Sequence, residues 1–212
     1  MRQDYTHIAI ILDRSGSMSG KESDVVGGVN TLFADQRKLP GDCTVTVVQF
    51  DTGDPYEVLR DGVNLKDIIA MSVAEYTPRG GTPLYDAMGR GIVTEGERLS
   101  KMDESMRPSK VVVCIVTDGL ENASREYTRD RIAAMTKEQT ETYGWQFIYL
   151  GANQDAILEG DKMGVQKGTS AKYAEQKTGG ALRAMSANVG NYRATGNKED
   201  LVWSAQQRKE LE

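Results

Sequence analysis

The chain has 212 residues, of which 39% are hydrophobic and 27% are charged, and its formal net charge at pH 7 is −5. This is the composition of an ordinary globular protein, and it excludes a disordered chain. No apolar run approaches the roughly 20 residues that a membrane-spanning helix needs. Residues 1–7 have neither the apolar core nor the cleavage site of a signal peptide, so we expect a cytoplasmic protein without a membrane partner.

The first predicted element is a buried strand over residues 8–12, where the apolar run is unbroken. It stops at Asp13, and Ser15 and Ser17 follow at alternate positions around Gly16. Open α/β sheets bind ligands at the carboxyl ends of their strands, so this loop lies where a ligand is expected. One carboxylate and two hydroxyls suit a hard cation such as Mg²⁺. Alternatively, the hydroxyls only cap the next helix.

Helices and strands then alternate. Apolar residues at helical spacing predict a helix within residues 20–39, and a β-branched run predicts a strand over 43–50. A short antiparallel edge strand is expected at 56–59 and a short helix near 65–70. A long helix is expected from 83 to about 105, since its apolar residues share one face.

Two later stretches supply further oxygen atoms near strand ends. Thr82 lies between a glycine pair and a proline, and Asp118 follows the apolar run 111–116. Beyond them we expect a helix over 128–143 and a strand over 145–150. A short helix then begins at Asn153, Gln154 and Asp155 and extends to about Met163.

The set Asp13-x-Ser15-x-Ser17, Thr82 and Asp118 resembles the metal-ion-dependent adhesion site of von Willebrand factor A domains. The resemblance implies an α/β fold with a doubly wound, mostly parallel six-stranded sheet, one short antiparallel edge strand and helices on both faces. In such domains Ser15 and Ser17 would bind Mg²⁺ directly, Thr82 directly or through water, and the two aspartates largely through water. One coordination position would remain for a carboxylate of a protein partner, and Mn²⁺ would also fit.

The polar loop after Asp118 resembles a bacterial and phage-borne branch of that family. The resemblance implies a rim around the metal face that contacts the partner, made of Gly81, Glu121, Asn122 and Arg125. Alternatively, this loop is only solvated, and Ser124 or Thr128 caps the next helix.

The resemblance divides the chain into a von Willebrand factor A domain at 5–164 and a partly helical C-terminal extension at 165–212. Eight basic and five acidic residues give the extension a net charge of +3, whereas residues 1–164 carry −8. We expect the extension to pack on the domain or to dock to a partner. Its charges are dispersed, which does not favour nucleic-acid binding.

The remaining reactive side chains favour structural roles. Cys43 and Cys114 fall on strands expected to flank the first strand, about 10 Å apart, which is too far for a disulfide. His7, the one histidine, opens the first strand and has no catalytic partner in the sequence. We therefore expect buried cysteines and a structural histidine.

These observations predict a Mg²⁺-dependent protein-interaction module rather than an enzyme. A phosphatase of the haloacid-dehalogenase type needs a second acid two residues after the first, and Ser15 stands there. One alternative is a self-assembling structural component, in which the metal face of one copy binds Glu210 or Glu212 of another. A Mg²⁺-dependent phosphatase-like enzyme is the second alternative.

Overall fold

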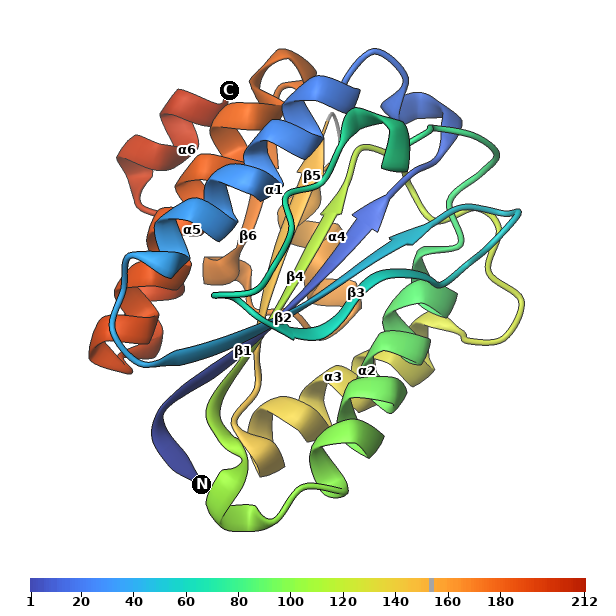
Figure 1. Ribbon diagram of the computed structural model, residues 1–212. Coiled ribbons are helices and arrows are strands. Elements are labelled where there is room, and N and C mark those ends of the chain that lie inside the picture. Colours follow the sequence, from blue (N-terminus) through green and yellow to red (C-terminus); the bar gives the residue numbers. More distant parts are fainter. Residues whose placement is uncertain (153–154) are drawn as a thin grey trace.

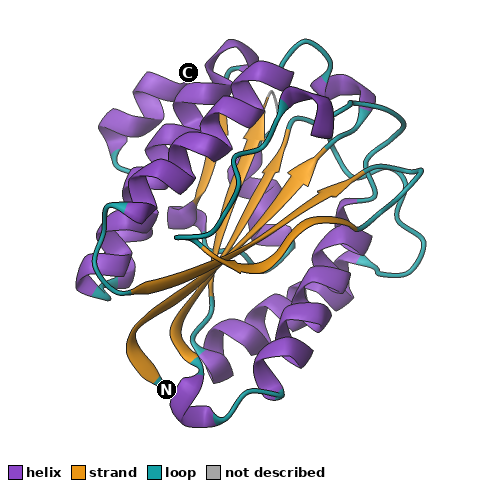
Figure 2. Ribbon diagram, viewed as in Figure 1, coloured by secondary structure: helices purple, strands orange, loops and turns teal. Residues whose placement is uncertain are grey.

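The structure is a computed structural model, and it describes residues 1–152 and 155–212. A single six-stranded sheet in the order β3-β2-β1-β4-β5-β6 has helices on both faces (Figures 1 and 2). The strands are β1 (Arg2–Asp13), β2 (Asp42–Phe50), β3 (Glu57–Asn64), β4 (Pro108–Thr117), β5 (Gln146–Ala152) and β6 (Ser170–Tyr173). Only β3 pairs antiparallel within the described sheet, so the predicted fold class is confirmed.

The register of the central strands places their carboxyl ends side by side. Asp13, the last residue of β1, lies opposite Phe50 of β2. On the other side of β1, Leu12 lies opposite Val116 of β4, so Asp13 is level with Thr117. The chain order changes direction between β1 and β4, and such a switch point is where doubly wound sheets open a ligand crevice.

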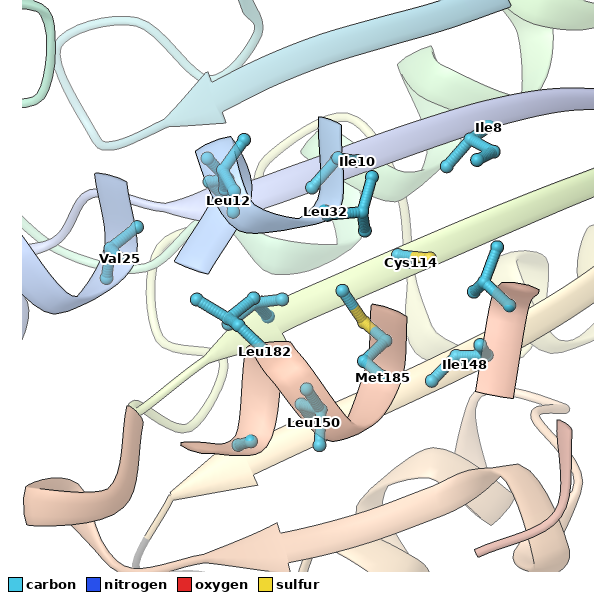
Figure 3. Close-up of a cluster of buried hydrophobic side chains, with 14 of the residues drawn as sticks. Ile8, Ile10, Leu12, Val25, Leu32, Cys114, Ile148, Leu150, Leu182 and Met185 are labelled. Carbon is cyan, nitrogen blue, oxygen red and sulfur yellow. The ribbon is translucent and has the colours of Figure 1, made fainter. Parts of the chain in front are cut away.

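Helices cover both faces of the sheet (Figure 1). On one face lie α1 (Glu22–Arg37), α5 (Thr178–Thr195) and α6 (Ala205–Leu211), and on the other α2 (Leu84–Ser100), α3 (Arg129–Tyr143) and α4 (Ala156–Lys162). On the first face, side chains of β1, β4 and β5 meet those of α1 and α5 in one apolar cluster (Figure 3). No helix in residues 1–152 and 155–212 is both long and apolar enough to cross a membrane.

Residues 165–212 complete this face of the sheet. They supply β6, and α5 packs closely along α1, where a Cβ on Gly28 would lie 2.5 Å from Leu182 Cδ1. Gln36 Nε2 donates to the Ser186 carbonyl at 2.8 Å. Arg193 Nη1 donates to the Gln36 carbonyl at 2.7 Å.

The predicted helix at 65–70 is wrong, and the chain forms a turn there. The side chain of Asn64 accepts a hydrogen bond from the Lys66 amide at 2.9 Å, which favours a turn over a helix. Arg37 of α1 donates to the carbonyls of Leu65 and Ile68 at 2.9 and 3.0 Å, so those carbonyls are satisfied from another element.

Other boundaries shift by a few residues. Strand β3 continues to Asn64 instead of ending at 59, and α2 ends at Ser100 instead of about 105. The predicted helix start at Asn153 and Gln154 lies outside the described residues. Asp155 caps α4 by accepting from the Leu158 amide at 3.1 Å.

The two cysteines are buried and unpaired, as predicted. They lie on β2 and β4, the two neighbours of β1. His7 is also fully buried, and its Nδ1 lies 2.9 Å from Thr44 Oγ1, which is the structural role expected for it.

Candidate metal centre

The first loop begins with a carboxylate that the fold holds still. Asp13 is fully buried at the end of β1. Its Oδ1 accepts from the Ser15 amide at 2.7 Å, and its Oδ2 accepts from Thr117 Oγ1 at 2.5 Å. The hydroxyl of Tyr76 also donates to the Asp13 carbonyl. The carboxylate is therefore oriented from the strand, the loop and the neighbouring strand together.

The two serines connect this loop to the end of β4. Gly16–Met18 form a single 3₁₀ turn whose Met18 side chain is buried in the core. This turn places Ser15 Oγ 2.9 Å from Ser17 Oγ, and Ser17 Oγ donates to Asp118 Oδ1 at 2.5 Å. Oxygen atoms from two strand ends, 101 residues apart in the sequence, therefore form one continuous cluster.

Thr82 faces the same cluster across a small space beside Gly119. A Cβ on Gly119 would lie 2.9 Å from Thr82 Oγ1, 3.6 Å from Ser17 Oγ and 3.8 Å from Asp13 Oδ2. The absence of a side chain at Gly119 therefore leaves a cradle lined with oxygen atoms. Three of the five predicted metal residues, Asp13, Ser17 and Thr82, therefore lie around it, and hydrogen bonds to Ser17 connect the other two, Ser15 and Asp118.

The composition of this cradle fits a hard cation. It offers two carboxylates and three hydroxyls, and such oxygen ligands are those that Mg²⁺, Ca²⁺ and Mn²⁺ prefer. In residues 1–152 and 155–212, no group of three or more His, Cys, Asp or Glu side chains is arranged to hold a metal. The hydroxyls are therefore essential to any metal-binding role of this cluster.

Burial shifts the protonation equilibrium of the Asp13 carboxyl. It raises the pKa of Asp13 to about 6, although hydrogen bonds from Thr117 and Ser15 favour the charged form. In the metal-free protein, the Asp13 carboxyl therefore titrates only slightly below neutral pH. A divalent cation in the cradle would favour the ionised form and displace that proton.

Lys21 is a functional candidate that the sequence analysis missed. It is the residue before α1, and its side chain is 10% exposed. The ammonium forms an ion pair with Asp118 Oδ2 and also donates to the Ser17 carbonyl at 3.1 Å. Nothing in the local sequence signals a contact with a residue 97 positions away.

An ion-pair cluster around the buried carboxylate of Asp51 holds the first loop in place. Arg14 Nε donates to Asp51 Oδ2 at 2.7 Å, and Arg79 Nε donates to the same oxygen at 3.0 Å. The Arg79 amide donates to the Arg14 carbonyl at 2.8 Å, and the Gly16 amide donates to the Gly80 carbonyl at 2.9 Å. The first loop and the loop that carries Thr82 are therefore held together by main-chain and side-chain bonds.

Two of the four predicted rim residues bond mainly within the protein. Asn122 accepts from the Thr82 amide at 2.9 Å, and a Cβ on Gly81 would lie 2.8 Å from its Oδ1. Glu121 accepts from the Tyr85 amide at 2.9 Å, at the beginning of α2, and thereby holds its loop against that helix. Arg125 is exposed, which leaves its side chain at the surface.

The helix-capping alternative for this loop is also visible. Thr128 is the N-cap of α3, and its hydroxyl accepts from the Arg131 amide at 3.3 Å. Ser124 Oγ instead accepts from the Asp86 amide of α2 at 3.1 Å. The loop therefore caps one helix and is attached to another.

No protein-family model matches the sequence, and no curated protein matches it. Solved structures do match. Proximal thread matrix protein 1 from the mussel byssus, in a structure described as having a zinc-occupied MIDAS motif, is 14% identical with a TM-score of 0.60. That match covers 84% of this chain and 46% of the mussel chain, so this chain spans less than half the length of that protein.

Two bacterial structures have the same architecture. The vWF domain of the type V pili tip protein Mfa5 from Porphyromonas gingivalis is 10% identical with a TM-score of 0.63, covering 90% of this chain and 95% of that one. A von Willebrand factor type A protein from Catenulispora acidiphila is 18% identical with a TM-score of 0.54, covering 87% and 42%. The chain therefore has the fold of a von Willebrand factor A domain.

Proposed function

We propose that this chain is a protein-interaction module that binds an acidic group of a partner protein through a divalent cation, either Mg²⁺ or Mn²⁺. The observation that carries the proposal is the oxygen-lined cradle beside Gly119. The residues that would hold the cation are Asp13, Ser15, Ser17, Thr82 and Asp118.

The donor set explains why such a site would need a partner. Three of the five donors are neutral hydroxyls, and Asp118 already shares its charge with Lys21. When bound, the cation supplies a positive charge that these residues only partly neutralise, and an acidic ligand would complete the neutralisation. The similar mussel structure has a zinc-occupied MIDAS motif, which supports a metal at the equivalent edge of this fold.

We propose no catalytic role for the site. The Ser15 hydroxyl lies 2.9 Å from Ser17 Oγ rather than beside a histidine, the usual base that activates a serine nucleophile. The one histidine, His7, is fully buried and lies 3.1 Å from Glu95 Oε2 inside the fold. We also propose a cytoplasmic location, where the buried, unpaired cysteines would stay reduced.

The alternative function is self-assembly, in which Glu210 or Glu212 at the end of α6 binds the metal face of another copy. Glu210 and Glu212 are exposed, but the tail main chain is held on its own molecule. The Ala174 amide donates to the Leu211 carbonyl at 2.7 Å, and Lys177 Nζ donates to the Glu210 carbonyl at 2.8 Å. This arrangement favours a separate protein as the partner.

The first experiment is calorimetric titration of Mg²⁺ and Mn²⁺ into EDTA-treated protein. Wild type and the control Ser19→Ala should bind, because Ser19 is exposed in the same loop, whereas Ser15→Ala/Ser17→Ala should not. Equal binding by the double variant would place the metal elsewhere. No binding by any of them would refute the metal site.

Affinity capture in each metal state then tests the interaction. A partner retained with Mg²⁺ and released by EDTA supports the module, whereas equal retention in both states contradicts metal-mediated binding. Light scattering with and without EDTA tests self-association. A metal-dependent increase in mass that truncation after Leu201 abolishes would favour the tail alternative.

A further inference from the structure

Lys21 directly contacts two of the proposed metal residues, Ser17 and Asp118, and no pattern in the sequence indicates this. Its ammonium contacts Asp118 Oδ2, donates to the Ser17 carbonyl at 3.1 Å and lies 3.6 Å from Glu175 Oε1. The first two contacts are hydrogen bonds, and the third is an ion pair beyond hydrogen-bonding distance. The side chain of Lys21 is 10% exposed and that of Asp118 is fully buried, so this ion pair is little screened by solvent.

The lysine and a divalent cation would use the same carboxylate. Asp118 has two oxygen atoms, of which Oδ1 accepts from Ser17 and Oδ2 pairs with Lys21. A cation entering the cradle would therefore meet a carboxylate whose charge is already partly neutralised. The two positive charges would also repel each other where the effective dielectric constant is low.

The same lysine changes the charge of the loaded site. With Asp13 and Asp118 both ionised, the buried carboxylates and Lys21 sum to −1, and a divalent cation brings the sum to +1. Glu175 contributes less, because its side chain is 42% exposed and solvent screens it. Without the lysine, the loaded site would be neutral and would have less need of an anionic ligand.

We propose that Lys21 is a selectivity-determining residue of this site. It weakens binding of the cation alone and strengthens binding of a carboxylate to the cation-loaded site. This inference rests on the proposed function and adds to it a coupling between the two ligands. By thermodynamic linkage, the carboxylate then raises the affinity for the cation by the same factor as the cation raises the affinity for the carboxylate.

The test compares three variants in two assays. Lys21→Met removes the charge and keeps most of the side-chain length, Lys21→Arg keeps the charge, and Lys38→Met is the control at an exposed lysine of the segment after α1. Mn²⁺ affinity of each EDTA-treated protein is measured by calorimetry. Binding of the Mn²⁺-saturated proteins to immobilised poly-L-glutamate is then measured at fixed ionic strength.

Opposite changes in the two assays are the expected result. Lys21→Met should bind Mn²⁺ about ten-fold more tightly than wild type and poly-L-glutamate about ten-fold more weakly. Lys38→Met should stay within about three-fold of wild type in both assays, and Lys21→Arg, which keeps the charge, should stay closer to wild type than Lys21→Met does in both. A purely structural role for Lys21 would weaken both interactions together, which would overturn the proposal, as would unchanged Mn²⁺ affinity in Lys21→Met.

Two results would concern different proposals. If wild type and Lys21→Met both fail to bind Mn²⁺, the metal site itself is refuted. If only Lys21→Met binds, competition by the lysine is supported and stronger than expected. Should thermal melting show that Lys21→Met is unfolded, Lys21→Gln replaces it with the same expected signs.

Discussion

Two buried ionic clusters lie along strand β1, and they differ in what surrounds them. In the inner cluster, between β1 and α2, Glu95 Oε2 accepts from Arg98 Nε at 2.8 Å and lies 3.1 Å from His7 Nε2. In the outer cluster, at the carboxyl end of the strand, Asp13 faces hydroxyls and the space beside Gly119. The inner acid is partnered mainly by cationic and ring nitrogen atoms of the protein, whereas hydroxyls contact both outer acids and Asp118 also pairs with the Lys21 ammonium. This difference fits a structural role for the inner cluster and the cation-binding role that we propose for the outer one.

Breaking the inner cluster should have the largest effect on folding. Glu95→Ala removes a buried carboxylate and leaves the groups that paired with it uncompensated, so we expect a loss of about 3–5 kcal/mol in the free energy of unfolding. Urea denaturation measures this loss, and Mn²⁺ affinity should not change. The control Glu97→Ala, on the exposed side of α2, should cost less than about 1 kcal/mol. A small effect of Glu95→Ala would show that the inner cluster does not stabilise the fold.

Breaking the outer cluster should instead weaken cation binding. Asp118→Asn keeps the shape of the side chain and removes its charge, so Mn²⁺ affinity should fall about 100-fold, whereas the unfolding free energy should change less than for Glu95→Ala. Calorimetry measures the Mn²⁺ affinity and urea denaturation measures the unfolding free energy. The control is Asp103→Asn, at an exposed position. Unfolding of Asp118→Asn would mean that Asp118 stabilises the fold as Glu95 does.

Filling the cradle should weaken cation binding without replacing any of the proposed ligand residues. The Cβ of Gly119→Ala would lie 2.9 Å from Thr82 Oγ1, so Mn²⁺ affinity should fall ten-fold or more. In the control Gly27→Ala, the new Cβ meets nothing within 4 Å inside α1, and the unfolding free energy should rise by about 0.5–1 kcal/mol. Unchanged Mn²⁺ binding by Gly119→Ala would place the cation outside the cradle.

The smallest expected effect comes from pH. The folded-state pKa of Asp13, about 6, lies above the ordinary value of 3.8 because burial disfavours the charged form. The protonated form therefore stabilises the metal-free fold at low pH, and this contribution is lost as pH rises from about 4 to about 6. Cation binding requires the ionised form, so Mn²⁺ affinity should rise about ten-fold from pH 5 to pH 7 and then level off. In metal-free Asp13→Asn, the loss of stability over that pH range should be smaller than in wild type.

The sequence allowed much of the outer cluster to be predicted, because its acids follow long apolar strands. Asp13 and Asp118 were placed at strand ends, and parallel pairing brings such ends to one edge. Lys21 was missed because its role depends on where α1 begins relative to a loop far away in the sequence. Glu121 and Asn122 were expected to face a partner, yet they bond to main-chain amides, and composition alone does not distinguish these roles.

The fold was predictable wherever an element had a long apolar pattern. The four residues of β6, Ser-Ala-Lys-Tyr, have no such pattern, so the residues alone predict no strand after residue 164. The strand forms because it pairs with β5, and its Tyr173 hydroxyl donates to the Thr117 carbonyl at 3.3 Å. The helix predicted at 65–70 does not form for a similar reason, because a distant element again decides the local structure. Arg37 of α1 donates to the main-chain carbonyls that helical hydrogen bonds would use.

The packing of α1 against α5 also bears on how the chain is synthesised. Gln36 and Ser186, which bond across these helices, are 150 residues apart. At about 5–20 residues per second, the ribosome needs on the order of 8–30 s to reach the second after making the first. During that time the apolar face of α1 lacks its partner helix. The nascent chain therefore exposes an aggregation-prone surface until α5 has been synthesised, and chaperone binding to stalled chains ending before residue 178 would detect it.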